Sequence, residues 1–145
     1  MVTHFPLVGI VFALLINIYA VVRKNPEVLK LSLWVYVLVG VSALIAYLTG
    51  DGAEEIIKSY PGITEDLTES HEHFALAFLI GALVAACISL YGLFISSTKE
   101  KVFLKITRIM MILTAVICIL AIETAVTGGN IRHSEIEKGV YKEVK

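Results

Sequence analysis

The most informative pattern along the chain is four long runs of apolar residues separated by polar segments. The runs are Phe5–Val22, Leu31–Leu48, Phe74–Ser96 and Ile109–Val126. Each holds about 18 to 23 residues, enough for a helix to cross, or nearly cross, a hydrocarbon core of roughly 30 Å. The pattern therefore predicts an all-α membrane protein, a bundle of four transmembrane helices.

The composition also indicates a membrane protein and suggests one transmembrane domain. Of 145 residues, 57% are hydrophobic and only 17% are charged, whereas soluble domains average nearer half and a quarter. The first run lacks a basic start and a small-residue cleavage site, so we expect it to stay as a helix and not to be removed as a signal peptide. We expect one transmembrane domain over residues 1–136 and a polar tail over 137–145.

The polar segments between the runs differ in charge. Residues 23–30 and 97–108 are basic, whereas residues 51–72 carry many acids and only one basic residue, Lys58. Because basic loops stay in the cytoplasm, we expect a multi-pass protein of the bacterial inner membrane with both termini on the outer, periplasmic side. Within the acidic segment, Ala53–Tyr60 has the spacing of a short amphipathic helix lying on the outer membrane surface.

The two cysteines bound the possible cofactor chemistry. Cys87 and Cys118 lie in the middle of apolar runs, and no CxxC or CxxCH motif occurs. Covalent attachment of c-type haem and a thiolate zinc site are therefore both excluded.

The two halves of the chain, about 3–58 and 70–136, share short motifs in the same order. The first half opens with His4-Phe5-Pro6-Leu7 and has Thr49-Gly50 after its second run; the second half opens with His73-Phe74-Ala75-Leu76 and has Thr127-Gly128. Matches in the same sense predict a parallel pseudo-repeat of two helical hairpins about an axis along the membrane normal. Gly128-Gly129 is expected to end the fourth helix, as glycine commonly does.

All four histidines fall at the outer ends of the expected helices. They are His4, His71, His73 and His133. Neutral imidazole is a good axial ligand for haem iron and a common ligand for zinc and copper. The clustering therefore predicts a polar site in the outer leaflet, most simply a b-type haem held by two histidines.

Helix geometry ranks the candidate haem ligands. His4 and His73 begin the first and third helices, which are diagonal neighbours in an up-down bundle. His73 shares a helix face with Ile80, whereas His71, about 200° away, shares one with Phe78. We therefore predict that His4 and His73 are the axial pair, with His133 the first substitute and His71 the last.

Two further polar residues fit the same hypothesis. Arg132 could neutralise a haem propionate, since its planar guanidinium suits carboxylate binding. Glu123 is a carboxylate inside an apolar run, about one turn before its end, and such residues are functional by default. It would handle protons or accept a hydrogen bond from a ligand's second imidazole nitrogen.

Three alternatives remain open from the residues alone. The histidines could be interfacial residues with no ligand. A non-haem copper, zinc or iron site could combine histidines with carboxylates, and its candidate ligands are His4, His73, His133, Glu54, Glu55 and Glu72. The chain could also be a structural subunit of a larger membrane redox complex.

With these residues the chain resembles a family of small four-helix bacterial integral membrane proteins of unknown function. The resemblance rests on His4-Phe5-Pro6, Thr49-Gly50, His73 or His71, Gly128-Gly129 and His133. Relatives in that family are sometimes fused to Rieske or cytochrome domains, which implies electron-transfer surroundings and favours haem over zinc. The expected partners are then quinol, an outer-side cytochrome or a Rieske-type subunit, within a larger complex or a homo-oligomer. We expect an electron-transfer protein rather than a stand-alone enzyme, and no nucleic acid.

Overall fold

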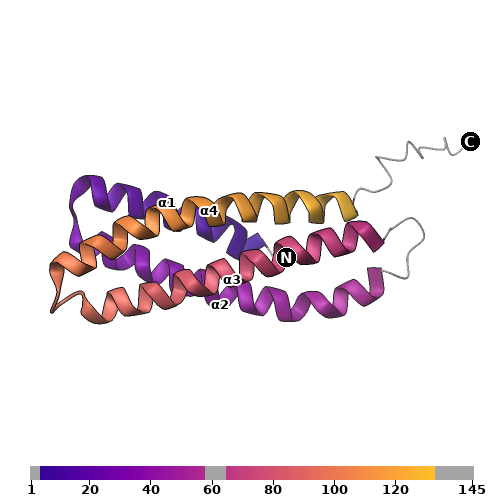
Figure 1. Ribbon diagram of the computed structural model, residues 1–145, viewed down its shortest axis with the longest axis horizontal. Coiled ribbons are helices and arrows are strands. Elements are labelled where there is room, and N and C mark those ends of the chain that lie inside the picture. Colours follow the sequence, from indigo (N-terminus) through magenta and orange to yellow (C-terminus); the bar gives the residue numbers. More distant parts are fainter. Residues whose placement is uncertain (1–3, 58–64, 133–145) are drawn as a thin grey trace, which may run out of the picture.

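The computed structural model is a bundle of four antiparallel helices (Figure 1). The helices are α1 (His4–Arg23), α2 (Pro26–Ile57), α3 (Glu65–Ile95) and α4 (Glu100–Arg132). The structure describes the backbone of residues 4–57 and 65–132, and the side chains of residues 4–50 and 68–130. Helices that follow each other in the chain pack together, and α1 also packs on α4. This arrangement puts α1 and α3 on opposite corners and confirms the predicted all-α, four-helix architecture.

Large apolar side chains cover the outside of the bundle. All four helices are long and apolar enough to cross a membrane. Exposed Val, Leu, Ile and aromatic side chains surround the bundle, running on successive helices from Phe5 to Val22, Leu31 to Leu48, Leu76 to Phe94 and Val102 to Val126. Water would penalise such a surface, whereas lipid chains solvate it. The chain is therefore a multi-pass membrane protein with the lipid bilayer as its environment.

Small residues hold the inside of the bundle together, most tightly between α2 and α3. A Cβ added to Gly40 would lie 2.6 Å from the Cβ of Ala86 and 3.1 Å from the carbonyl oxygen of Ala82. Glycine and alanine let two backbones approach closely, which replaces hydrophobic exclusion from water as the source of packing in a membrane. The middle of the bundle is therefore filled by directly touching helices.

One buried side chain ties three helices together. Asn17 of α1 is fully buried, and its Nδ2 donates to the hydroxyl of Tyr36 on α2 (3.3 Å) and to the carbonyl of Thr107 on α4 (3.1 Å). These contacts link α1 to both of its neighbours, α2 and α4. They also fix the depth of α1 against α4.

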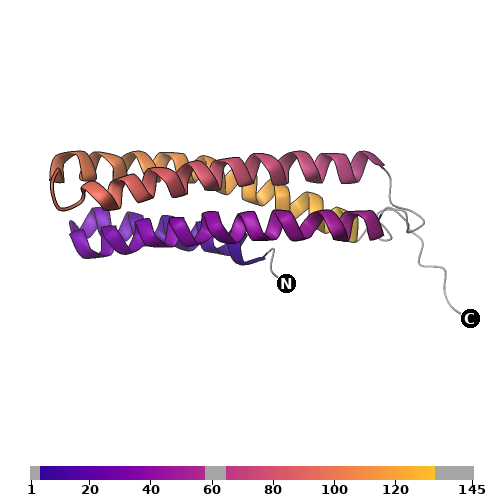
Figure 2. The same ribbon diagram turned by 90° about the horizontal axis from the view of Figure 1, so that it is seen from below.

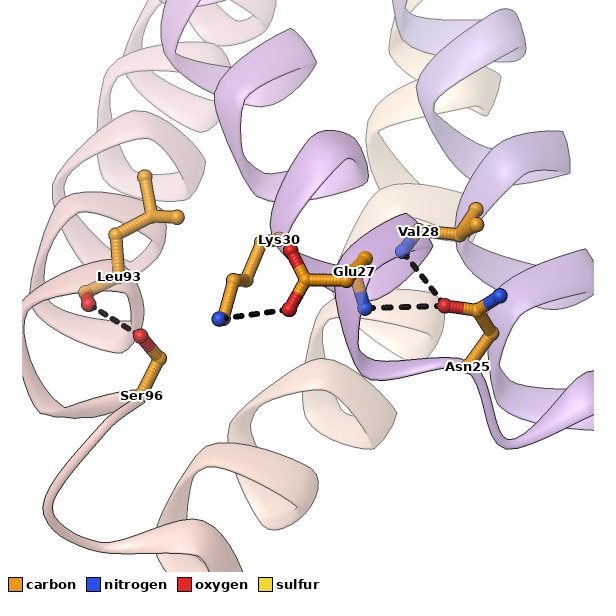
Figure 3. Close-up of polar contacts among 6 residues, drawn as sticks. All are labelled: Asn25, Glu27, Val28, Lys30, Leu93 and Ser96. Carbon is orange, nitrogen blue, oxygen red and sulfur yellow. Dashed lines mark hydrogen bonds and ion pairs between the residues drawn. The ribbon is translucent and has the colours of Figure 1, made fainter.

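The turn between α1 and α2 is built by a short polar sequence. Lys24 takes a left-handed conformation (φ 51°), which ends α1. Asn25 then caps α2, since its Oδ1 accepts from the backbone N–H groups of Glu27 (3.0 Å) and Val28 (3.2 Å) (Figure 3). Pro26 is the first residue of α2, where its missing N–H costs nothing. The turn between α3 and α4 lies at the same end of the bundle (Figure 1).

The four helices differ in length, and this difference shapes the opposite end. α1 has 20 residues, whereas α2, α3 and α4 have 32, 31 and 33. At about 1.5 Å per residue, α4 is roughly 20 Å longer than α1. Figures 1 and 2 show α1 beginning partway along the bundle while the other helices continue. Beyond the first residue of α1, the described chain thus supplies three helices instead of four.

Two expectations about this outer end are wrong. Ala53–Ile57, expected within a separate surface helix, continues α2 without a break, and Gly128-Gly129 lies inside α4. Adding residues to an existing helix is favourable once it is nucleated, and Ala53, Glu54 and Glu55 are good helix formers. The remainder of the expected surface helix, Lys58–Tyr60, lies outside the described residues.

Candidate functional site

The outer end places one histidine in a seam between two helices. His71 of α3 is half-buried, and its Nδ1 lies 3.1 Å from the Oγ1 of Thr127 on α4. A Cβ added to Gly128 would lie 3.1 Å from His71 Cε1. The imidazole therefore rests so closely on α4 that a side chain at position 128 would displace it by a few tenths of an ångström.

The hydrogen bonds around Thr127 favour one tautomer of a neutral His71 ring. Thr127 Oγ1 donates to the carbonyl oxygen of Glu123 at 2.8 Å, with that of Thr124 also in reach at 3.2 Å. A hydroxyl has one proton, and when that proton is donated to the backbone of α4, Thr127 Oγ1 can only accept from His71. The proton of the neutral ring is then on Nδ1, and Nε2 keeps its lone pair. An imidazole oriented by a hydrogen bond through one nitrogen is the usual arrangement of a metal-ligating histidine.

The pair ranked first from the sequence is not brought together. His4 and His73 are both exposed, and they lie on α1 and α3, which occupy opposite corners of the bundle. The ring of His73 meets its neighbour Phe74 edge-on, with centroids 6.0 Å apart. Ile80, which shares a helix face with His73, is also exposed. His73 therefore points out of the bundle, not into it.

Depth separates these two histidines as well. Asn17 bonds Thr107, so the N-terminal end of α1 at His4 lies beside Leu120 of α4. His71 bonds Thr127, which places His73 near Ala125. Five helical residues correspond to about 7 Å along the axis. At the depth of His4, the space between the helices is filled by buried apolar residues, namely Ala43, Phe78, Leu79 and Ala121. A haem between His4 and His73 does not fit this interior.

The remaining candidates lie at the rim or outside the described side chains. Glu123 is exposed on α4, near the outer edge of the apolar surface, and Glu72 is also exposed. Predicted roles for Glu54, Glu55, Arg132 and His133 fall on side chains outside those that the structure describes. Among the described residues, no group of three or more histidine, cysteine or acidic side chains could hold a metal ion.

Sequence reasoning ranked His71 last and did not single out Thr127. A usable signal was present, because His71 shares a helix face with Phe78, and Phe78 is buried. The partner residue could not be identified without knowing which residue of α4 stands opposite. That alignment follows from close contacts further in, such as Gly81 against Ile117.

Comparison with known proteins adds no relative to this description. No protein-family model, no curated protein and no solved structure matches the chain.

Proposed function

We propose that this chain is a membrane-bound electron-transfer protein that binds b-type haem at its outer end, with His71 as an axial ligand through Nε2. The observation that carries the proposal is the orientation of His71. Its Nδ1 lies 3.1 Å from Thr127 Oγ1, an arrangement that would leave the Nε2 lone pair to bind iron. This proposal replaces the pair His4 and His73, which the bundle keeps apart.

The three-helix outer end suits such a site better than the middle of the bundle. In the middle, the contact of Gly40 with Ala86 leaves no space between helices. α1 does not reach the level of His71, because it begins further in, at His4. No described helix therefore fills the fourth corner of the bundle at that level. His133 follows directly after α4, and we propose it as the second axial ligand. Arg132 beside it would neutralise a propionate.

The residues of this chain would do three things for the cofactor. Thr127 orients the His71 ring and makes Nε2 a better electron donor through the hydrogen bond at Nδ1. Gly128 leaves room for the ring. Glu123, at the rim, would take up or release a proton when the site changes charge. Bound haem would supply one-electron redox chemistry.

The direction of the chain in the membrane follows from its charges. Basic residues gather at the end that holds the α1–α2 and α3–α4 turns, and acidic residues gather at the His71 end. By the positive-inside rule the His71 end faces the periplasm of a bacterial inner membrane. The electron partner would then be quinol in the bilayer, an outer-side cytochrome or a Rieske-type subunit.

A spectrum of the purified protein tests this proposal. The protein is expressed with ample haem, purified in detergent, and measured first air-oxidised and then dithionite-reduced. We expect a Soret band that shifts and sharpens on reduction, with separate α and β bands. A featureless spectrum would contradict the proposal, and elemental analysis of the same sample would then distinguish a copper, zinc or iron protein from a structural subunit.

A further inference from the structure

Three cations form a stripe along one face of α4, at the end of the bundle that carries the two described turns. Lys101, Lys105 and Arg108 are spaced by four and then three residues, so they stack on the same face of the helix. All three side chains are exposed. Ile112 and Val116 continue this face towards the bilayer centre and are 73% and 53% exposed. The stripe therefore leads directly into the lipid-facing surface of α4.

Exposed aromatic residues mark the depth of this stripe. Each of the other three helices carries a tyrosine or tryptophan that is more than half exposed near this end: Tyr19, Trp34 and Tyr91. Contacts of Gly92 with both Leu33 and Ile106 put Trp34 and Tyr91 at the depth of Thr107. The hydrogen bond from Asn17 to Thr107 puts Tyr19 within about one half-turn of the same depth. Tyrosine and tryptophan gather at the membrane–water interface, so this is the depth of the lipid headgroups.

α4 differs from its neighbours at this depth. It carries Lys105 and Arg108, whereas the other three helices carry aromatic rings. The position is unfavourable for the helix itself. α4 begins at Glu100, and cations in the first turns oppose the positive end of the helix dipole. The ion pair found among the described residues is Lys30 with Glu27, so no described carboxylate neutralises the stripe. Its three charges therefore face the headgroup layer without a partner among the described residues.

We propose that Lys101, Lys105 and Arg108 bind the phosphate of an anionic phospholipid whose acyl chain lies along Ile112 and Val116. Arginine presents a planar fork that matches two phosphate oxygens, and lysine adds mobile point charges. Basic clusters beside a membrane span attract anionic headgroups in this way. The proposal concerns the end opposite His71 and does not depend on haem.

Lipid binding to the detergent-purified full chain tests the proposal. Native mass spectrometry would compare phosphatidylglycerol with phosphatidylcholine of the same acyl chains. We expect the wild type to bind phosphatidylglycerol preferentially. The triple variant Lys101→Gln, Lys105→Gln, Arg108→Gln should bind it about a hundredfold more weakly, with phosphatidylcholine binding unchanged.

A matched variant separates the stripe from the general charge of this end. Arg23→Gln, Lys24→Gln, Lys99→Gln removes the same charge from the two turns and should retain the preference for phosphatidylglycerol. Equal loss in both triple variants would overturn the proposal, as would a wild type that does not distinguish the two lipids. Release of the bound lipid by an equal concentration of inorganic phosphate would also overturn it, since the site would then recognise free phosphate. If a variant fails to fold, a wild type that does not distinguish the two lipids would still overturn the proposal.

Discussion

His71 and Thr127 form the hydrogen bond on which the proposed site depends. The hydrogen bonds of Thr127 limit the role that His71 Nδ1 can take. The hydroxyl of Thr127 is committed to the backbone of its own helix, at 2.8 Å from the carbonyl of Glu123. That commitment makes it an acceptor for His71 Nδ1. Ser and Thr side chains in membrane helices commonly donate to a carbonyl of the preceding turn. Here this hydrogen bond within α4 leaves the Thr127 oxygen to orient a histidine on α3.

Replacing Thr127 with Val should weaken cofactor binding without removing the ligand. Valine keeps the shape of threonine but offers no acceptor to His71 Nδ1. Loss of such an orienting partner typically costs about 10–100-fold in affinity, and haem titration of the apoprotein measures it. Thr124→Val is the control, since Thr124 Oγ1 bonds the carbonyl of Leu120 and is not bonded to His71. Equal losses in both variants would contradict the role given to Thr127.

Asn17 is a structural residue at the other end, and its replacement should destabilise the bundle. Asn17→Ala removes bonds to α2 and α4. Interhelical hydrogen bonds in membranes are worth about 0.6 kcal/mol on average, so we expect a loss of about 1–2 kcal/mol in the free energy of unfolding in mixed micelles. Ser89→Ala is the matched control, because the buried Ser89 Oγ makes no hydrogen bond in the described structure. A larger loss for Ser89→Ala than for Asn17→Ala would contradict this assignment.

Between elements, Gly40 is the described glycine that leaves least room for a side chain, at the point where α2 meets α3. Gly40→Ala would place a methyl group 2.6 Å from Ala86 Cβ and against the backbone of Ala82. Overpacking of this kind costs about 1–3 kcal/mol, measurable by unfolding in mixed micelles. Gly50→Ala lies in the same helix with no atom within 4 Å of the added group, so it should be neutral or stabilise by about 0.5–1 kcal/mol. Restoration of stability by adding Ala86→Gly to Gly40→Ala would confirm the contact, whereas equal effects of the two glycine substitutions would exclude it.

The elements themselves show what hydropathy can and cannot predict. Four spans and their antiparallel order were predictable, because a helix is the simplest way to satisfy its own backbone hydrogen bonds in lipid. The helix ends were not, since Asp51–Ile57 and Glu65–Glu72 are polar but remain helical. Hydropathy predicts where the lipid-facing part of a helix ends. Whether the helix continues into water depends on the helix propensity of the residues that follow. The extension of three helices beyond α1 was therefore missed.

Across the whole molecule, the two ends have different chemistry. One end carries the basic stripe and the exposed aromatic residues, and the other carries His71 within a three-helix extension. The placement of His4, His71 and His73 towards one end was predictable, because each stands just before an apolar run that starts on the outer side. Their orientation was not, because a shift of two residues turns a side chain by about 200° around the helix. His73 therefore points out of the bundle, whereas His71 meets a neighbouring helix. The resemblance to the histidine-phenylalanine-proline family and the haem function stay predictions.

Spectra of two single variants would decide whether His71 is the ligand. His71→Ala and His73→Ala are expressed with haem and compared with the wild type, oxidised and reduced. We predict that His71→Ala loses the six-coordinate low-spin spectrum, while His73→Ala, whose side chain points away from the bundle, keeps it. A spectrum that survives His71→Ala and disappears in His73→Ala would contradict the site described above.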